Sequence, residues 1–238
     1  MKRGRLETAL RLGRVSNLPT VWTNVAVGMA LAGIGTLPVG LLALLAAAAS
    51  LLYVGGMYLN DAFDAGWDAV HRPERPIPAG DVRARTVYVA GFAFLGAGVL
   101  LVRLAAANQR PLIAALALAV LIVLYDVSHK RNPLAVVIMA LCRVTVYVLA
   151  ALAVAPASPP PTFYVGAGAL FLYLIFLSTL ARKETLHPRL PKMIGSLVAG
   201  IALLDAAILL LTGHGLGALG AVGAFFLTRV AQRRVPGS

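Results

Sequence analysis

Eight long apolar segments, separated by Gly, Pro and charged residues, restrict the fold of this 238-residue chain more than any other feature. They span residues 18–35, 39–59, 83–103, 110–127, 133–154, 162–181, 192–212 and 214–230. A helix that crosses a bilayer needs about 20 mostly apolar residues. None of the segments alternates apolar and polar residues in the manner typical of a membrane β-barrel. We therefore predict an all-α polytopic membrane protein, a bundle of about eight transmembrane helices in a single domain over 1–238.

The composition excludes several classes of protein. Apolar residues make up 60% of the chain and charged residues 13%, whereas soluble domains have about 45–50% and about 25%. A soluble globular enzyme and a disordered chain are both inconsistent with these values. Cys142 is the only cysteine, so no disulfide forms within one chain. The basic N-terminus is not followed by a short apolar stretch with a cleavage site, and we expect it to be retained.

The basic residues lie mainly on one side of the predicted membrane helices. Lys and Arg number 21 against nine Asp and Glu, for a formal net charge of +12. All but Arg103, Arg110 and Arg143 fall in the N-terminal arm, in the loops after the second, fourth and sixth segments, or in the tail. The positive-inside rule places these regions and both termini in the cytoplasm, in a bacterial inner membrane. The positive charge is thus explained by topology, and we expect no nucleic-acid partner.

A cluster of acidic residues after the second segment indicates chemistry. Asp61, Asp64 and Asp68 fall within about 60° of one another on a helix, where they repel unless a cation lies among them. Mg²⁺ prefers such oxygen ligands together with substrate phosphates. Arg72 and Arg75 follow on a proline-rich stretch and are suited to bind phosphate oxygens. The pattern predicts a Mg²⁺–diphosphate site at the membrane surface.

Isolated polar and aromatic residues near or within the apolar segments are further candidates. Arg143 lies inside the fifth segment, where an ionisable group indicates function, with the site carboxylates or Asp205 as expected partners. Asp126 either orients an acceptor or, as we expect, pairs with Lys130 four residues later. We expect three aromatic residues to lie in the interfacial belt: Tyr53, Tyr58 and Trp67.

The pattern Asn60-Asp61-x-x-Asp64-x-x-x-Asp68, followed by Arg-Pro-x-Arg-Pro-Ile-Pro-x-Gly, resembles the first aspartate-rich motif of the UbiA superfamily of intramembrane prenyltransferases. Residues 11–20 with Asn24 resemble the family's first-helix entry, and Tyr125-Asp126-x-x-x-Lys130-Arg131 resembles its basic turn after the fourth helix. The CDP-alcohol phosphotransferases also use spaced aspartates, but their Asp-Gly-x-x-Ala-Arg pattern is absent here. The resemblance implies a helical bundle, usually of nine helices, around a central cavity.

The resemblance also implies a reaction and a set of site residues. The reaction is Mg²⁺-dependent transfer of a prenyl or polyprenyl group from an isoprenoid diphosphate to a lipophilic, often aromatic, acceptor among membrane lipids. One or two Mg²⁺ ions would be held by Asp61, Asp64, Asp68 and Glu184, the three aspartates and Lys130 being catalytic. The diphosphate would be bound by Asn60, Arg72, Arg75, Lys130, Arg131, Arg182 and Lys183. The acceptor or cavity residues would be Asn17, Asn24, Tyr125, Asp126 and Arg143.

The stretch after the sixth segment departs from the family pattern. Family members carry two aspartates four residues apart here, whereas this chain has Glu184 and then Pro188. A short chain with Arg-Lys-Glu at this place resembles the EboC-like subgroup. A single Mg²⁺, with Arg182 and Lys183 replacing part of a second ion's charge, is consistent with the departure. Two alternatives stay open: a UbiA-like protein that binds or moves an isoprenoid or lipid precursor without transferring it, and an unrelated transporter or channel.

Overall fold

The computed structural model describes residues 4–130, 132–155, 159–183 and 190–235, and these are helices joined by turns. The helices are α1 (Arg5–Leu12), η1 (Val15–Asn17, 3₁₀), α2 (Leu18–Leu31), α3 (Val39–Phe63), α4 (Ala65–His71), α5 (Ala84–Ala105), α6 (Arg110–Ser128), α7 (Ala135–Val154), α8 (Pro161–Ala181), α9 (Leu190–Leu211) and α10 (Gly215–Ala231). Eight of them correspond to the eight predicted segments, and the all-α prediction is confirmed. The short helices α1 and α4 were not predicted as separate elements.

Helices α3 and α5 to α9 are the six that are long and apolar enough to cross a membrane among the described residues. Helix α10 has 17 residues and α2 only 14. The predicted segment 18–35 is therefore wrong at its end, because α2 stops at Leu31. Gly33 explains the stop: its φ of +84° lies in the left-handed region that commonly ends helices.

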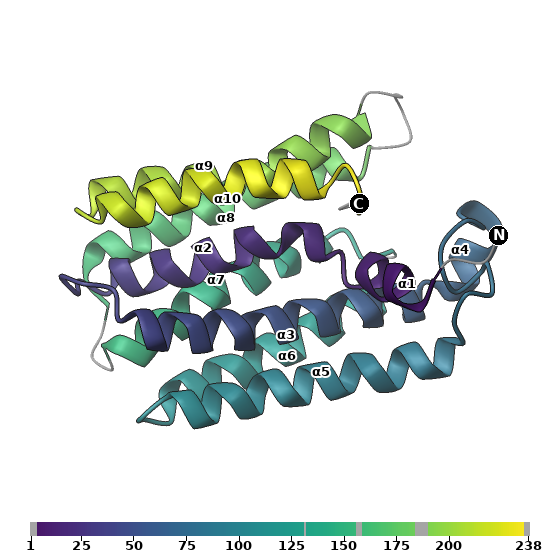
Figure 1. The fold of residues 1–238 in the computed structure, drawn as a ribbon, viewed down its shortest axis with the longest axis horizontal. Helices are drawn as coiled ribbons and strands as arrows, with labels where there is room; N and C mark the ends of the chain where they lie inside the picture. Colours follow the sequence, from purple (N-terminus) through teal and green to yellow (C-terminus); the bar gives the residue numbers. More distant parts are fainter. Residues whose placement is uncertain (1–3, 131, 156–158, 184–189, 236–238) are drawn as a thin grey trace.

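Helices α2 and α7 form the middle of the bundle (Figure 1). On one side lie α3, α5 and α6, and on the other lie α8, α9 and α10; α2 contacts members of both groups. One apolar core includes Val27 and Tyr147, and a second includes Val25 and Leu149, so α2 and α7 contribute to both. Because α2 is surrounded, nearly all of its side chains are buried.

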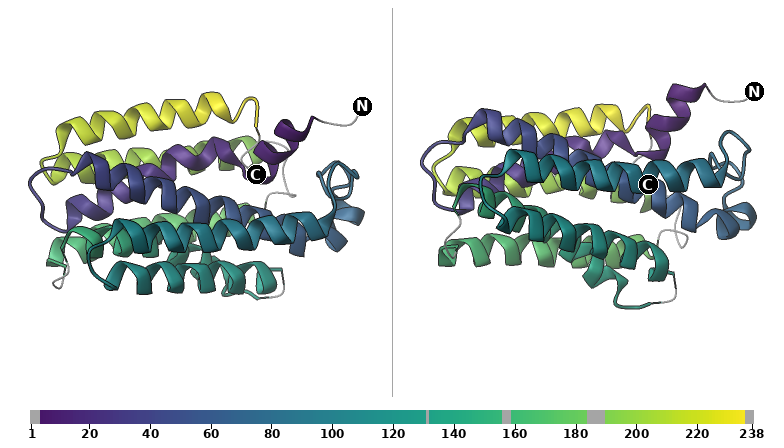
Figure 2. Two further views of the ribbon diagram at one scale, coloured as in Figure 1. Left: turned by 60° about the horizontal axis from the view of Figure 1, so that its bottom comes forward. Right: turned by 90° about the horizontal axis from the view of Figure 1, so that it is seen from below.

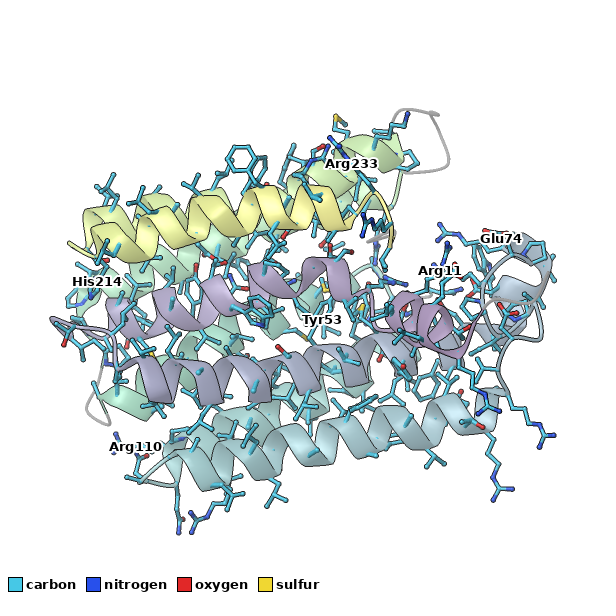
Figure 3. All side chains as sticks on the ribbon, in the orientation of Figure 1. Arg11, Tyr53, Glu74, Arg110, His214 and Arg233 are labelled. Atoms are coloured by element: carbon cyan, nitrogen blue, oxygen red, sulfur yellow. The ribbon has the colours of Figure 1, made fainter. Side chains whose placement is uncertain are left out.

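The long helices run alternately up and down the bundle, so both termini lie at the same end (Figures 1 and 2). Figure 3 places Arg11 and Glu74 at this end, Arg110 and His214 at the opposite end, and Tyr53 between them. We call the end that carries α1, α4 and the turn after α6 the site end. The basic loops predicted to share one side of the membrane therefore do meet at one end of the fold.

Large apolar side chains cover the outer surface of the bundle. They include Val89, Phe92 and Leu100 of α5, Ile113 and Val120 of α6, and Leu219 and Phe226 of α10, all at least half exposed. Such extended apolar surface marks contact with a membrane or a partner. Lipid tails are the environment that fits the length and composition of these helices.

Helices α3 and α5 pack closely because glycines face the contact. A Cβ placed on Gly98 of α5 would lie 2.8 Å from Leu52 Cγ and 3.0 Å from the Ala48 carbonyl oxygen. Gly96, on the same helix, has nothing within 4 Å of the corresponding position. Small residues allow this kind of backbone approach in membrane bundles.

We expect Gly98→Ala to lower the free energy of unfolding by about 2 kcal/mol, because backbone atoms of α3 cannot move aside easily. Gly96→Ala is the matched control, and it should be neutral or raise that free energy by up to about 1 kcal/mol through helix propensity. Thermal unfolding of the purified variants in detergent measures both. Equal stability of the two variants would contradict the close contact.

Candidate functional site

The three aspartates lie at the site end, where α3 leads into α4. Asp61 is in the last turn of α3, Asp64 lies between the two helices with helical φ and ψ, and Asp68 is in α4. All three are buried, Asp68 to 1% exposure. The chain then turns through the proline-rich stretch, whose backbone hydrogen bonds include Ala79 N to Arg75 O at 2.9 Å. The stretch after His71 is thus a series of turns rather than a helix, as its prolines require.

Arg75 joins two of these carboxylates. Its Nη1 donates to Asp68 Oδ2 at 2.9 Å and to Asp61 Oδ1 at 3.2 Å. Arg14 Nη2 donates to the same Asp61 oxygen at 3.2 Å. Two basic side chains from distant parts of the sequence therefore neutralise the carboxylates that otherwise repel each other.

Asp64 is neutralised from α6 rather than from the proline-rich stretch. Lys130 Nζ lies 3.0 Å from Asp64 Oδ1, and His129 Nε2 lies 3.4 Å from its Oδ2. The ammonium of Lys130 also lies 3.7 Å from the centre of the Trp67 ring. The predicted pairing of Lys130 with Asp126 is thus wrong, because Lys130 follows the end of α6 and turns toward α4.

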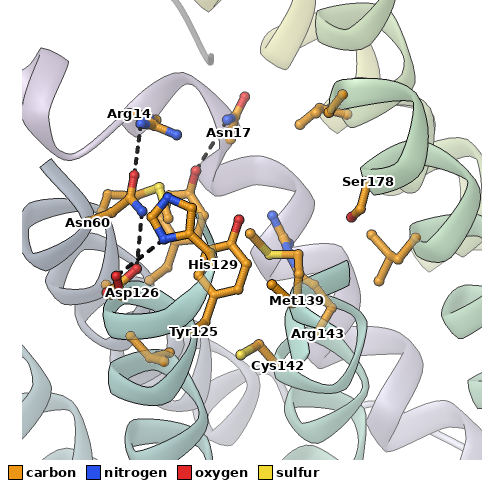
Figure 4. A pocket seen from close by; sticks show the side chains of 18 of the residues that line it. Arg14, Asn17, Asn60, Tyr125, Asp126, His129, Met139, Cys142, Arg143 and Ser178 are labelled. Carbon is orange, nitrogen blue, oxygen red and sulfur yellow. Dashed lines mark hydrogen bonds between the residues drawn. The ribbon is translucent and has the colours of Figure 1, made fainter. Parts of the chain in front are cut away.

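Asp126 instead faces Asn60, as Figure 4 shows. Asn60 Nδ2 donates to Asp126 Oδ1 at 3.2 Å, and Arg14 Nη2 donates to Asn60 Oδ1 at 3.3 Å. Asp126 Oδ2 and Asp68 Oδ1 are buried side-chain oxygens without a hydrogen-bond partner among the described residues. Buried unpartnered oxygens are costly, and they mark places where a ligand can bind.

Burial and charge act against each other on the groups at the site end. Burial by itself raises the pKa of Asp64, but hydrogen bonds and positive charge from His129 and Lys130 outweigh burial and lower that pKa. The pKa of His129 is raised, since Asp64 outweighs the effect of burial. Burial raises the pKa of Asp68 in spite of Arg75. Asp64 and His129 thus favour their charged forms together, as an ion pair does.

A cavity of about 740 Å³ extends from the aspartates into the bundle. The predicted site residues that line it are Asn17, Asn60, Asp64, Asp68, Arg72, Arg75, Tyr125, Asp126, Lys130, Arg143 and Arg182. Apolar residues from six helices line it as well: Val21, Ala49, Leu118, Val146, Leu174 and Ile201. The cavity is therefore charged where the aspartates stand and apolar elsewhere.

Other predicted site residues lie apart from this lining. Asp61, Asn24 and Lys183 are not among the described lining residues; Asp61 is held by arginines, and Asn24 is fully buried beside Asp205. Arg182 lines the cavity while its Nη2 donates to the Asn132 carbonyl at 2.7 Å. Glu184 and Arg131 lie outside the described residues.

The residues that line the cavity without having been predicted as site residues include Arg14, His129, Tyr53 and Trp67. Arg14 has a φ of +42°, a conformation that non-glycine residues rarely adopt, and its contacts to Asn60 and Asp61 hold it there. His129 is four residues from Tyr125, and the two rings stack at 5.0 Å (Figure 4). That spacing on one helix face was the signal for His129.

The structure does not support the interfacial belt prediction for Tyr53 and Tyr58, and the prediction stays untested for Trp67, which is 41% exposed. Tyr53 lines the cavity and accepts a hydrogen bond from Asn17 Nδ2 at 3.2 Å. Trp67 lines the cavity beneath Lys130. Tyr58 is 8% exposed, and its hydroxyl donates to the Ala9 carbonyl.

The carboxylates do not form a shared ligand cluster in this arrangement. Among the residues that the structure describes, no group of three or more His, Cys, Asp or Glu side chains is placed so that it could hold a metal ion. The ion pairs give the reason, since Asp61, Asp64 and Asp68 each turn toward a basic side chain.

A model of the UbiA prenyltransferase family matches residues 20–232 of this chain. The chain belongs to the UbiA prenyltransferase family. The resemblance in its motifs is thereby confirmed, and this family member is an integral membrane protein. Its closer resemblance to the EboC-like subgroup, like the single domain over 1–238, stays a prediction.

Curated relatives of this UbiA family member share one name, digeranylgeranylglyceryl phosphate synthase. The protein from Methanothrix thermoacetophila is 29% identical over 196 residues, 82% of this chain and 67% of the relative. Those from Methanopyrus kandleri and Ignicoccus hospitalis are each 37% identical, over 52% and 55% of this chain. The matches span only 45% and 42% of those two relatives' own lengths.

Solved structures show the same fold. A UbiA homolog from Archaeoglobus fulgidus bound to DMAPP and Mg²⁺ superposes with a TM-score of 0.64 at 18% identity, covering 94% of this chain and 86% of that one. A digeranylgeranylglyceryl phosphate synthase structure superposes with a TM-score of 0.61 at 17% identity, covering 97% and 95%. The helical bundle is thus shared with both.

Proposed function

We propose that this protein transfers a prenyl group from an isoprenoid diphosphate to a lipophilic acceptor in a Mg²⁺-dependent reaction. One observation carries the proposal: a single cavity joins a cluster of carboxylates and basic side chains to an apolar interior. The charged part suits a diphosphate with its metal, and the apolar part suits an isoprenoid tail. The A. fulgidus homolog, described as bound to DMAPP and Mg²⁺, supports this choice of donor.

The donor set at the site end has the chemistry that Mg²⁺ prefers, although the carboxylates face basic side chains in this arrangement. All three aspartates supply hard oxygen ligands, and Asp68 Oδ1 is buried without a partner among the described residues. Asp61, Asp64 and Asp68 would hold the ion together with substrate phosphate, and Glu184 remains a proposed further ligand. When bound, Mg²⁺ would neutralise charge that develops on the diphosphate leaving group.

The chain's own basic residues perform the other steps at this end. Arg72, Arg75 and Lys130 line the cavity beside the aspartates, where they bind phosphate oxygens and stabilise the departing diphosphate. Arg182 and Arg14 approach from α8 and from the turn before η1. Their guanidinium groups add positive charge that stabilises the departing diphosphate.

The apolar lining holds the prenyl tail and excludes water from the allylic carbon. The rings of Tyr53 and Tyr125 line the cavity, and aromatic faces stabilise a developing cation. The relatives' name, digeranylgeranylglyceryl phosphate synthase, favours a glyceryl phosphate lipid as acceptor. We also propose that the site end faces the cytoplasm, because the basic loops gather there.

The test is an activity assay on the purified full chain in lipid nanodiscs. Dimethylallyl, geranyl and geranylgeranyl diphosphates are each supplied with Mg²⁺ and either a monoprenyl glyceryl phosphate or a hydroxybenzoate, and prenylated product is measured by mass spectrometry. We expect product with at least one pair, and its loss when EDTA removes Mg²⁺. Binding of the diphosphates without product from any pair would instead support the non-catalytic alternative, and Mg²⁺-independent flux across liposomes a transporter.

A further inference from the structure

Arg143 is a charged residue inside the membrane-spanning part of the bundle that the proposed chemistry does not use. It lies on α7, eight residues after the helix begins at Ala135, which is roughly 12 Å along the helix axis at 1.5 Å per residue. Its side chain lines the cavity together with Met139 and Cys142 of the same helix (Figure 4). Arg143 thus lies deeper than the basic side chains that surround the aspartates.

A chain of hydrogen bonds holds this guanidinium in place. Arg143 Nη1 donates to Asn24 Oδ1 at 2.9 Å, and Asn24 Nδ2 donates to Asp205 Oδ2 at 2.8 Å. Thr23 and Tyr147 donate to Asp205 through their hydroxyls, each at 2.5 Å. Asp205 is fully buried and does not line the cavity described. The carboxylate therefore orients Asn24, and Asn24 orients Arg143.

This arrangement leaves Arg143 without a direct anionic partner. A guanidinium has five N–H donors, and the contacts described for this side chain are one bond to Asn24 and the Tyr53 ring, 5.4 Å away. No carboxylate of the described residues lies within 4.0 Å of it. A cation inside a membrane protein is costly and normally faces an anion or a water-filled cavity. Its unused donors point to a ligand that carries an anionic group.

We propose that Arg143 binds an anionic group, a phosphate or a carboxylate, on the acceptor, and so determines which acceptors this enzyme takes. The inference rests on the proposed prenyl transfer and specifies the chemical class of its second substrate. The donor's diphosphate has its own basic residues near the aspartates, and its tail is uncharged. An anion at the depth of Arg143 therefore belongs to the acceptor. Arg143 contacts this substrate, whereas Asn24 and Asp205 are positioning residues.

Acceptor kinetics of Arg143→Gln test this assignment. The probes are a monoprenyl glyceryl phosphate, the same lipid without its phosphate, and a hydroxybenzoate beside the uncharged phenol, with geranylgeranyl diphosphate as donor. Each anionic probe is paired with its uncharged counterpart. In the pair that the enzyme accepts, loss of the charge-assisted hydrogen bonds should raise the KM of the anionic probe at least about 10-fold. The uncharged member should show little change, and the donor's dissociation constant should stay within about twofold. Whichever pair responds identifies phosphate or carboxylate.

A double variant separates binding from a structural role. If Arg143 only compensates the charge of Asp205, then Arg143→Gln with Asp205→Asn restores an uncharged core and should return KM to the wild-type value. If Arg143 binds the acceptor, KM stays raised in the double variant. Arg143→Lys keeps the charge and should recover part of the affinity. Thermal unfolding shows which variants are folded.

A binding measurement keeps this inference distinct from the proposed function. The anionic probe should raise the unfolding temperature of the wild type but not of Arg143→Gln or the double variant. If the anionic probe stabilises only the wild type while no product forms, the anion site at Arg143 is supported and the proposed prenyl transfer is contradicted. If product forms but KM for anionic and uncharged probes changes equally, the role of Arg143 is overturned and prenyl transfer stands. If neither anionic probe changes the unfolding temperature of the wild type, the role of Arg143 is likewise overturned.

Discussion

Asp64→Asn is expected to lower the rate of prenyl transfer at least about 100-fold, the size of effect seen when one electrostatic contact to a transition state is removed. Asp64 is the carboxylate at which α3, α4 and the turn after α6 meet, through Lys130 at 3.0 Å and His129 at 3.4 Å. Asn has nearly the same shape but lacks the charge that holds both Mg²⁺ and Lys130. The loss should therefore appear in kcat more than in the yield of folded protein.

The rate is measured with the donor and acceptor pair that gives product in the wild type, across a range of Mg²⁺ concentrations. Glu7→Gln is the control, because Glu7 is an exposed carboxylate at the same end, and the ion pair described for it is with Arg11. It should retain wild-type activity. Full activity of Asp64→Asn in folded, membrane-inserted protein would contradict the assignment of the site.

Arg75→Met is expected to destabilise the protein by roughly 3 kcal/mol, as breaking a buried ion pair leaves charge uncompensated. Arg75 is 16% exposed and holds both Asp68 and Asp61, whose side chains are 1% and 8% exposed. Without the guanidinium, Asp68 loses the ion pair described for it, and Asp61 keeps the one with Arg14. The freed carboxylates should then bind Mg²⁺ more readily.

Thermal unfolding in detergent, with and without Mg²⁺ at about millimolar concentration, measures both the loss of stability and the response to Mg²⁺. Mg²⁺ should raise the unfolding temperature of Arg75→Met more than that of the wild type. Arg11→Met breaks only an exposed pair, at 33% and 50% exposure, and should change the free energy of unfolding by less than about 1 kcal/mol. An Arg75→Met protein as stable as the wild type, with no added response to Mg²⁺, would contradict the role given to this ion pair.

Much of the fold was predictable because membrane helices depend on the length and position of apolar runs. Segments such as 39–59 and 162–181 correspond to α3 and α8 within a few residues. The exception is α2, where a long apolar run contains the turn at Gly33. Hydrophobicity cannot distinguish a short buried helix followed by a turn from a spanning one, since both environments are apolar.

The candidate site was predictable in its acids and less so in its bases. The spacing of Asp61, Asp64 and Asp68 is local, so the sequence shows it directly. Arg14, in contrast, lies 47 residues before Asp61 and was explained by topology alone. Since Lys and Arg at membrane ends serve topology in any case, their number hides the few that also contact the site.

The sequence by itself determined the helices, the side of the bundle on which the loops meet, the family and the aspartates, because each depends on residue type and spacing along the chain. Only the tertiary structure decided the partners: Asp64 with Lys130, Asp126 with Asn60, and Arg143 with Asn24. These pairs join residues that lie far apart in the sequence. Which helices become neighbours, and which faces they turn to each other, follows from packing of the whole bundle, and short-range patterns do not contain that information.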